Sequence, residues 1–323
     1  MRKAITLLGV ALALAAAVGA EYHYGGKWGS LGSGDGQFYH PVGVAVAPNG
    51  NVYVVDVGNS RVQYFTAAGS FLGKWGSAGT GAGQFDTPYG TAVAANTGNV
   101  YVADADNDRI QYFTAAGSFL GSWGTAGSGN GQFGTPMAVD VRDSNGYVYV
   151  TDTGNSRVQY FTYQGMYVGK WGSAGSGNGQ FGWAHFVAVD NTGRVYVTDR
   201  VLNRIQYFND TGGYLGGWGS SGAGNGQFNI PGGVDVDNAR SYVIVADCFN
   251  NRVQYFTATG SFLGTWGSYG SGNGQFQSPL GIAVNPNTHD VYVTDFDNNR
   301  VQYFYDDTAI APSSLGRVRA LFK

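Results

Sequence analysis

The sequence of 323 residues predicts an all-β fold, a six-bladed β-propeller of four-stranded antiparallel blades. Three observations lead to this prediction. Tryptophans recur every 47 or 48 residues, a motif rich in β-branched residues recurs in phase with them, and no helical periodicity separates them. Six units of this length are typical of propellers, and we expect the indoles to pack between blades. The tryptophans are Trp28, Trp75, Trp123, Trp171, Trp218 and Trp266.

Each unit divides into four strand-like runs, which residues 42–76 illustrate. The first run, VGVAV, is apolar and β-branched, and the dipeptide Asn49-Gly50 that follows is typical of hairpin turns. The runs NVYVVD and RVQYF come next, and SFLGKWG completes the unit. An open solenoid is the alternative. Solenoids usually need atypical capping repeats, whereas these repeats are uniform to both ends.

The two ends of the repeat region predict how the ring closes. The sixth repeat ends in VQYF at 301–304 and lacks a fourth strand, whereas HYGGKWG at 23–29 matches a fourth strand that has no strands before it. We expect this N-terminal segment to complete the sixth blade and remove an exposed edge. The propeller is therefore predicted over residues 21–307. The C-terminal tail, 308–323, is either a short basic amphipathic helix or a frayed end.

Residues 1–20 are predicted to form a secretory signal peptide. Arg2 and Lys3 precede the apolar run ITLLGVALALAAAVGA, and Val18 and Ala20 place small residues where a signal peptidase cleaves, before Glu21. A retained membrane anchor is the alternative, although the run is short for a span. We therefore expect a secreted, periplasmic or extracellular cell-surface protein.

Charge and cysteine content narrow the classes of partner. Removing the signal peptide takes the formal net charge from −3 to −5, so nucleic acid is not an expected partner, because phosphate binding needs a basic surface. Cys248 is the single cysteine, so no intrachain disulfide can form. We expect a monomer that meets a membrane only through the signal peptide or the tail. No cofactor is predicted, and a zinc or calcium ion in the central channel is left as an alternative.

A polar motif, D-x-x-N-x-R, follows the second strand of five units, and the fourth unit keeps its aspartate and arginine. Because Asp and Asn hydrogen-bond turn backbone and Arg pairs with a carboxylate in fork geometry, we interpret the motif as a structural turn clamp. A residue that serves a single functional site would not recur in all six repeats. The set comprises Asp56, Asn59, Arg61, Asp104, Asn107, Arg109, Asp152, Asn155, Arg157, Asp199, Arg204, Asp247, Asn250, Arg252, Asp295, Asn298 and Arg300.

The motif D-x-x-N-x-R-[VI]-Q-x-F after V-Y-V, with P-x-G-[VI]-A-V upstream, resembles the NHL repeat over residues 23 to about 304. The resemblance implies a six-bladed propeller and says little about function. NHL propellers of tripartite-motif ubiquitin ligases bind RNA or protein, and many exported bacterial and archaeal ones have unknown roles.

A distantly similar catalytic propeller, peptidyl-α-hydroxyglycine α-amidating lyase, uses zinc held by three histidines near the channel. Of the six positions after a strand-opening proline, His185 alone matches this pattern, and Arg200 alone matches the slot of the functional arginine. The five other positions carry Val42, Tyr89, Met137, Gly232 and Leu280. The expected tyrosine is absent from the neighbouring turn, TGNS at 153–156. Because a catalytic zinc site usually has three protein ligands, the sequence favours a binding or scaffold module. The alternative is a metal-dependent propeller enzyme, lyase-like or lactonase-like.

The fourth repeat departs most from the pattern. GWAHF replaces the x-P-x-G segment, and DRVLNR places a leucine where the asparagine belongs. The fifth and sixth turns add phenylalanines. Exposed aromatics with an arginine are typical of binding hot spots, so we predict a site on one face for a protein, peptide or glycan at the cell surface. The alternative is that these side chains fill gaps in the core. The predicted cluster is Trp183, His185, Phe186, Arg200, Leu202, Phe249 and Phe296, with Cys248 beside it as either a buried filler or a surface thiol.

Overall fold

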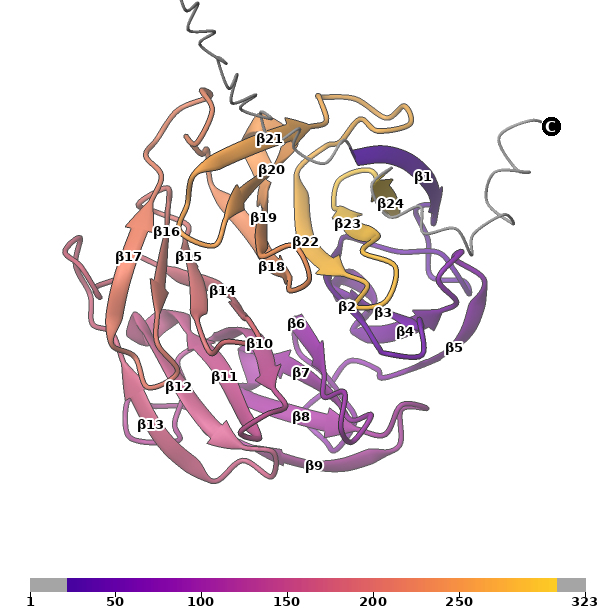
Figure 1. The fold of residues 1–323 in the computed structure, drawn as a ribbon. Coiled ribbons are helices and arrows are strands. Elements are labelled where there is room, and N and C mark those ends of the chain that lie inside the picture. The colour runs from indigo at the N-terminus through magenta and orange to yellow at the C-terminus, as the bar shows by residue number, and fades with distance from the viewer. Residues whose placement is uncertain (1–21, 307–323) are drawn as a thin grey trace, which may run out of the picture.

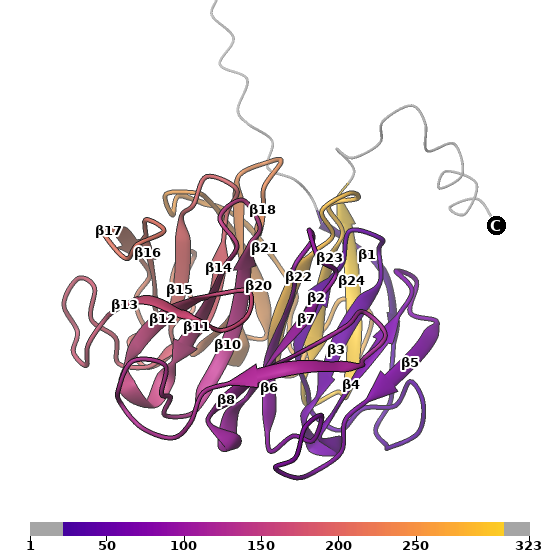
Figure 2. The same ribbon diagram turned by 90° about the horizontal axis from the view of Figure 1, so that it is seen from below.

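The computed structural model describes residues 22–306, which form six four-stranded antiparallel sheets arranged as a ring (Figure 1). The chain advances around the ring one blade at a time, and the first strand of each blade lies nearest the centre (Figure 1). Figure 2, turned by 90°, shows that the strands run between the two faces of the ring. The predicted signal peptide and C-terminal tail lie outside the described residues. Within residues 22–306, no helix is long and apolar enough to span a membrane.

Each blade has four strands, which we take in order outward from the centre. The innermost strands are β2 (Pro41–Val46), β6 (Pro88–Val93), β10 (Pro136–Arg142), β14 (Ala184–Val189), β18 (Pro231–Asp237) and β22 (Pro279–Val284). The second strands are β3 (Val52–Asp56), β7 (Val100–Asp104), β11 (Tyr147–Asp152), β15 (Val195–Asp199), β19 (Tyr242–Asp247) and β23 (Val291–Asp295). The third strands are β4 (Arg61–Phe65), β8 (Arg109–Phe113), β12 (Arg157–Thr162), β16 (Arg204–Phe208), β20 (Arg252–Thr257) and β24 (Arg300–Asp306).

The outermost strands are β5 (Phe71–Trp75), β9 (Phe119–Trp123), β13 (Tyr167–Trp171), β17 (Tyr214–Trp218), β21 (Phe262–Trp266) and, for blade six, β1 (Tyr22–Trp28). Four short 3-10 helices follow second strands, namely η1 (Val57–Asn59), η2 (Ala105–Asn107), η3 (Thr153–Asn155) and η4 (Cys248–Asn250). The burial of the side chains along a strand depends on the place of that strand in the blade. Strand β3 is buried at all five positions because blades cover both its faces, whereas β5 alternates half-buried and exposed residues.

The N-terminal strand closes the ring, as the sequence predicts. Strand β1 pairs antiparallel with β24, with Tyr22 opposite Asp306 and Trp28 opposite Val301. The sixth sheet therefore has the strand order β1-β24-β23-β22. Both ends of the described chain lie in one blade, and β24 is covered rather than left as a sheet edge.

A buried carboxylate organises the turn between the second and third strands of each blade. In blade one, Asp56 accepts hydrogen bonds from Asn59 Nδ2 at 3.0 and 2.9 Å and from Arg61 Nε at 2.7 Å. The Arg61 guanidinium also donates to the carbonyls of Ser33 and Gln37, in the loop that enters the same blade. Because the pair is buried and every partner is satisfied, it fixes the turn of a blade against its incoming loop.

Aromatic side chains join each blade to the next, as the tryptophan spacing predicts. The Trp28 ring of blade six lies 5.5 Å, between centroids, from the Phe65 ring of blade one. The Trp28 indole also covers Gly69, where φ is +86° and an added Cβ would lie 2.7 Å from the ring, so this turn requires glycine. The Tyr292 hydroxyl donates across the same interface to the carbonyl of Ala67 at 3.0 Å. Equivalent tryptophan contacts recur between the other blades.

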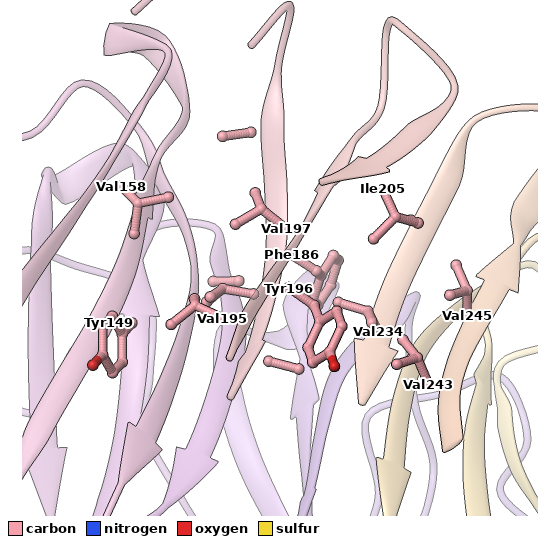
Figure 3. Packing of buried hydrophobic residues seen from close by; sticks show 14 of the residues in the cluster. Tyr149, Val158, Phe186, Val195, Tyr196, Val197, Ile205, Val234, Val243 and Val245 are labelled. Carbon is pink, nitrogen blue, oxygen red and sulfur yellow. The ribbon is translucent and has the colours of Figure 1, made fainter. Parts of the chain in front are cut away.

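The hydrophobic core lies between neighbouring blades. Figure 3 shows part of one cluster, in which Val195 and Val197 of blade four lie between Tyr149 of blade three and Val243 of blade five. These four side chains are fully buried. Removing an aliphatic side chain of this size from water contributes about 1.5–3 kcal/mol, so the interfaces between blades hold the ring together.

Blade four departs from the common clamp. Leu202 occupies the asparagine position, and the Asp199 carboxylate lies 3.4 Å from Arg204 Nε, against 2.6–2.7 Å for the pairs of the other five blades. The carboxylates of the other five clamps each accept one backbone N–H from the incoming loop, at 2.7–2.8 Å. Asp199 accepts two, from Gly182 and Trp183, at 3.1 and 3.0 Å. The loss of one amide therefore turns the carboxylate away from its arginine and toward the incoming loop.

This difference predicts unequal costs for removing the carboxylate. Asp56→Ala should lower the free energy of unfolding by about 3–5 kcal/mol, because it leaves a buried guanidinium without a counter-charge. Asp199→Ala should cost clearly less, since the Arg204 side chain is 18% exposed against 7% for Arg61. Equilibrium urea unfolding of the two variants measures both losses. Equal losses would contradict this account of the clamp.

Candidate functional site

Two cavities lie at opposite ends of the central channel. One, of about 600 Å³, opens where the inner strands begin and is bordered by the loops that enter the blades and the turns after the second strands. The other, of about 550 Å³, opens where the inner strands end. We call the first the channel-mouth site. Its lining includes Tyr39, His40, Val42, Val57, Tyr89, Arg200, Cys248, Phe249, Leu280, Phe296 and Asp297.

The channel-mouth site contains three of the seven residues that the sequence predicts for a ligand site. These are Arg200 from blade four, Phe249 from blade five and Phe296 from blade six. Blade one contributes Tyr39, and blade two contributes Tyr89, neither of which the sequence predicts. The site is therefore centred on the channel and extends to blades one and two, instead of covering blades four to six alone.

The predicted exposure is wrong for two residues. His185 is fully buried and Phe186 is 7% exposed, because both lie on the inner strand β14, which neighbouring blades cover. Phe186 lines the opposite cavity. Leu202 is half-buried beside the loop that enters blade four and does not line the channel-mouth site. Trp183, by contrast, is 37% exposed.

Arg200 joins several of these side chains. It follows directly after β15, and its Cζ lies 5.6 Å from the centre of the Trp183 ring. Its guanidinium NH1 lies 3.4 Å from His185 Nε2, and the same imidazole nitrogen lies 3.1 Å from the Tyr89 hydroxyl. The backbone N–H of Arg200 donates to the Trp183 carbonyl at 3.1 Å, which ties the turn to the incoming loop. We call these four residues the Arg200 cluster.

Burial keeps the neighbours of Arg200 uncharged at neutral pH. Desolvation, and then the charge of Arg200, lower the pKa of His185 to about 3. Burial raises the pKa of Tyr89 and of Cys248 to about 12 each. A neutral imidazole that accepts at Nε2 carries its proton on Nδ1. The Pro231 carbonyl opposes the fall in the pKa of His185. Among residues 22–306, however, no acceptor forms a hydrogen bond of good geometry with His185 Nδ1.

The channel residues do not fit the three-histidine zinc site that the resemblance to the lyase implies. Within residues 22–306, no group of three or more His, Cys, Asp or Glu side chains is close enough to hold a metal ion. His185 instead makes its contacts with a hydroxyl and a guanidinium. A cation beside the imidazole opposes the binding of a metal cation there.

The opposite cavity contains two carboxyl groups that the sequence analysis missed. Asp140 and Asp235 lie on the inner strands of blades three and five and line this cavity. Each accepts one backbone N–H from its own strand and one from the inner strand of the next blade, at 2.7–2.8 Å. The remaining repeats carry alanine there, so a comparison of repeats position by position would have found both. Those alanines are Ala45, Ala92, Ala188 and Ala283.

These carboxyl groups titrate well above their ordinary range. Desolvation, and then the negative charge of Asp235, raise the pKa of Asp140 from 3.8 to about 8. Desolvation likewise raises the pKa of Asp235 to about 7, and the backbone N–H groups oppose the shift. Both residues are half-buried by surface area, since one side opens onto the cavity while protein atoms surround the rest of the carboxyl group.

Comparison with known proteins identifies the repeat. The model of the NHL-repeat family matches residues 38–65 and 276–304, which run from the Gln-Phe pair to the third strand in the first and sixth repeats. The chain carries NHL repeats. The polar motif that forms the clamp is thus part of the NHL signature in this propeller. No curated protein matches the sequence.

Solved structures similar to this NHL propeller are remote in sequence. A catalytically inactive variant of virginiamycin B lyase from Staphylococcus aureus, with quinupristin, has 15% identity and a TM-score of 0.60 over 88% of each chain. A protein of unknown function from Bacteroides thetaiotaomicron has 14% identity and a TM-score of 0.65, over 87% of this chain and 76% of its own. A chain of a nidogen–laminin complex has 15% identity and a TM-score of 0.56, over 75% and 84%. At these identities the likeness shows the fold alone.

The raised pKa values predict how stability changes with pH. A carboxyl group whose pKa is higher in the folded state contributes stability that is fully present below its unfolded pKa and lost as pH rises through the folded pKa. The contribution of Asp140 and Asp235 to the free energy of unfolding should therefore decrease as the pH rises from about 4 to about 8.

The double variant Asp140→Ala/Asp235→Ala introduces the alanine that the other four blades have at this position. As the pH rises through this range, its free energy of unfolding should fall less than that of the native protein. Urea unfolding at several pH values measures the slope. An unchanged slope in the double variant would refute the raised pKa values.

Proposed function

We propose that this NHL propeller is an exported binding module that takes a protein, peptide or glycan ligand at the channel-mouth site. The observation that carries the proposal is the state of Arg200. Within residues 22–306 it makes no ion pair with a carboxylate, whereas the arginine of every repeat clamp does. A half-buried cation that lines a cavity and has no counter-charge can bind a negatively charged group of a ligand.

Exposed aromatic side chains around the cavity support the same proposal. Phe249 is 53% exposed and Tyr39 is 47% exposed, and both line the channel-mouth site. The repeat does not require either side chain. The position of Phe249 holds Gly58 in blade one and Gly154 in blade three. Large apolar side chains kept in water at a cavity rim supply the contact area of a binding hot spot.

At the channel-mouth site, the protonation states of His185, Tyr89 and Cys248 favour binding over acid–base catalysis by these three groups. A general acid or base works best with a pKa near the operating pH. At this site the pKa of His185 is about 3, and those of Tyr89 and Cys248 are about 12, so none of them exchanges protons readily near neutrality. The similar solved structures include both a lyase and a nidogen–laminin complex, so fold likeness alone does not separate the two functions.

A triple substitution tests the proposal without disturbing the repeat. Arg200→Thr, Phe249→Gly and Phe296→Ala copy the residues at the same positions of other turns, Thr153, Gly154 and Ala105. We expect this variant to keep its melting temperature within a few degrees. It should also lose binding to those members of a mixed library of short peptides and oligosaccharides that the native protein binds in ligand-observed NMR.

A second triple variant is the matched control for this experiment. Leu120→Ser, Met166→Ser and Tyr269→Ser remove exposed apolar side chains elsewhere on the ring. This control should bind the same library members as the native protein. Binding that survives the channel-mouth substitutions would overturn the proposal, and so would unfolding of that variant, since the cluster would then be core.

A further inference from the structure

We propose that the channel-mouth site recognises a single carboxylate carried on an apolar group, with Arg200 as the residue that binds the carboxylate. This inference rests on the proposed function, because it names the ligand class of the same site. The ligand is a small apolar carboxylic acid or the free end of a chain whose last residue is apolar. Both sources present the same chemistry to the site.

The first argument is the number of hydrogen-bond donors that Arg200 has left. A guanidinium has five N–H donors arranged to meet the two oxygens of a carboxylate. The contact with His185 is long, at 3.4 Å, and the single lone pair of that nitrogen is shared with Tyr89 at 3.1 Å. The Tyr89 hydroxyl is a second partner of the guanidinium. These two neutral partners cannot use all five donors, so Arg200, which lines the cavity, keeps donors for the oxygens of a carboxylate.

The second argument is the orientation of the guanidinium. The Trp183 ring lies 5.6 Å from Arg200 Cζ, in the range of a cation–π contact. The backbone hydrogen bond between the two residues fixes their loops to each other. A guanidinium held by an aromatic ring on one side and by His185 on another loses less conformational freedom when a ligand binds.

The third argument concerns charge. Arg200 is the one arginine or lysine that lines the channel-mouth site in the described chain, and Asp297 at the rim is negative and exposed. Asp297 accepts a hydrogen bond from Ser278 Oγ at 2.7 Å, which does not neutralise it. One cation and one carboxylate in the same lining suit a ligand with one negative charge and disfavour a phosphate dianion.

The fourth argument concerns the cavity wall. Beside Phe249 and Tyr39, the wall is made by valine and leucine side chains and by Phe296, whose ring packs 4.3 Å from that of His40. Such a wall leaves most sugar hydroxyls without partners, and unpaired polar groups reduce affinity. An apolar group attached to the carboxylate fits this wall better than an acidic oligosaccharide.

Calorimetric titration of the full chain with paired probes tests this inference. The acids are 3-phenylpropionate, as the small acid, and N-acetyl-glycyl-phenylalanine, as the chain end. Each is compared with its uncharged carboxamide. We expect the better acid to bind the native protein more tightly than its amide by on the order of tenfold to a hundredfold. Whichever acid binds more tightly identifies the source of the carboxylate.

Three variants assign the effect to its residue. Arg200→Thr should abolish the preference for the acid, while Arg200→Lys should keep only part of it because an ammonium lacks the planar fork. Phe249→Gly should weaken acid and amide alike and so keep their ratio. Melting temperatures of all three variants verify that each is folded.

The outcomes separate this inference from the proposed function. Equal binding of acid and amide to the native protein, with both weakened by Phe249→Gly, overturns the inference and leaves a binding module in place. Tighter binding of a glucuronic-acid disaccharide than of either acid also overturns it. If no probe binds at millimolar concentration, the inference fails. The proposed function fails separately, if the channel-mouth triple variant keeps the binding of the peptide and oligosaccharide library.

Discussion

The buried aspartate–arginine pair of each repeat is the interaction on which the ring depends. It joins the end of the second strand and the start of the third strand, which are close in the chain, to the loop from the previous blade, which in blade one lies 17 to 28 residues earlier. In blade one the Asp56 carboxylate also accepts the backbone N–H of Tyr39 at 2.7 Å, so one carboxylate at the end of the second strand serves donors from the other two segments. Without it, Arg61 and several loop carbonyls would be buried without partners, which costs more free energy than the pair itself contributes.

Because the clamp is repeated, one blade can depart from it while the ring stays closed. Blade four lacks both the proline that opens the inner strand and the asparagine of the turn, and its ion pair is longer. The same two changes accompany Trp183 and Arg200, which lie together at the channel. Blade four therefore combines a weaker clamp with the residues that make the channel mouth chemically distinct. If the proposed function holds, blade four exchanges local stability for a binding residue, which is common at functional sites.

The fold could be predicted from the sequence because six copies of one unit report the same strands, turns and closure. That Arg200, Phe249 and Phe296 lie together could be predicted for a related reason, since each breaks a repeat at a turn whose position is known, and all three line one cavity. Exposure could not be predicted, because it depends on which neighbouring blade covers a residue of the inner strand. His185 and Phe186 are buried for that reason. The contribution of Tyr39 from blade one also needs the closed ring, which brings the first and last blades together.

The central claim is that the departures of blade four from the common repeat supply Arg200, and the Trp183 ring beside it, to the proposed channel-mouth site. The most direct test restores the repeat while keeping Arg200, with Trp183→Thr, Ala184→Pro and Leu202→Asn. The measurement is the free energy of unfolding of this variant together with its affinity for the apolar carboxylate. We expect a stability gain of about 1–3 kcal/mol, from the restored amide bonds to a buried carboxylate, and a loss of at least tenfold in affinity. A more stable protein that binds as tightly as the native one would contradict the claim.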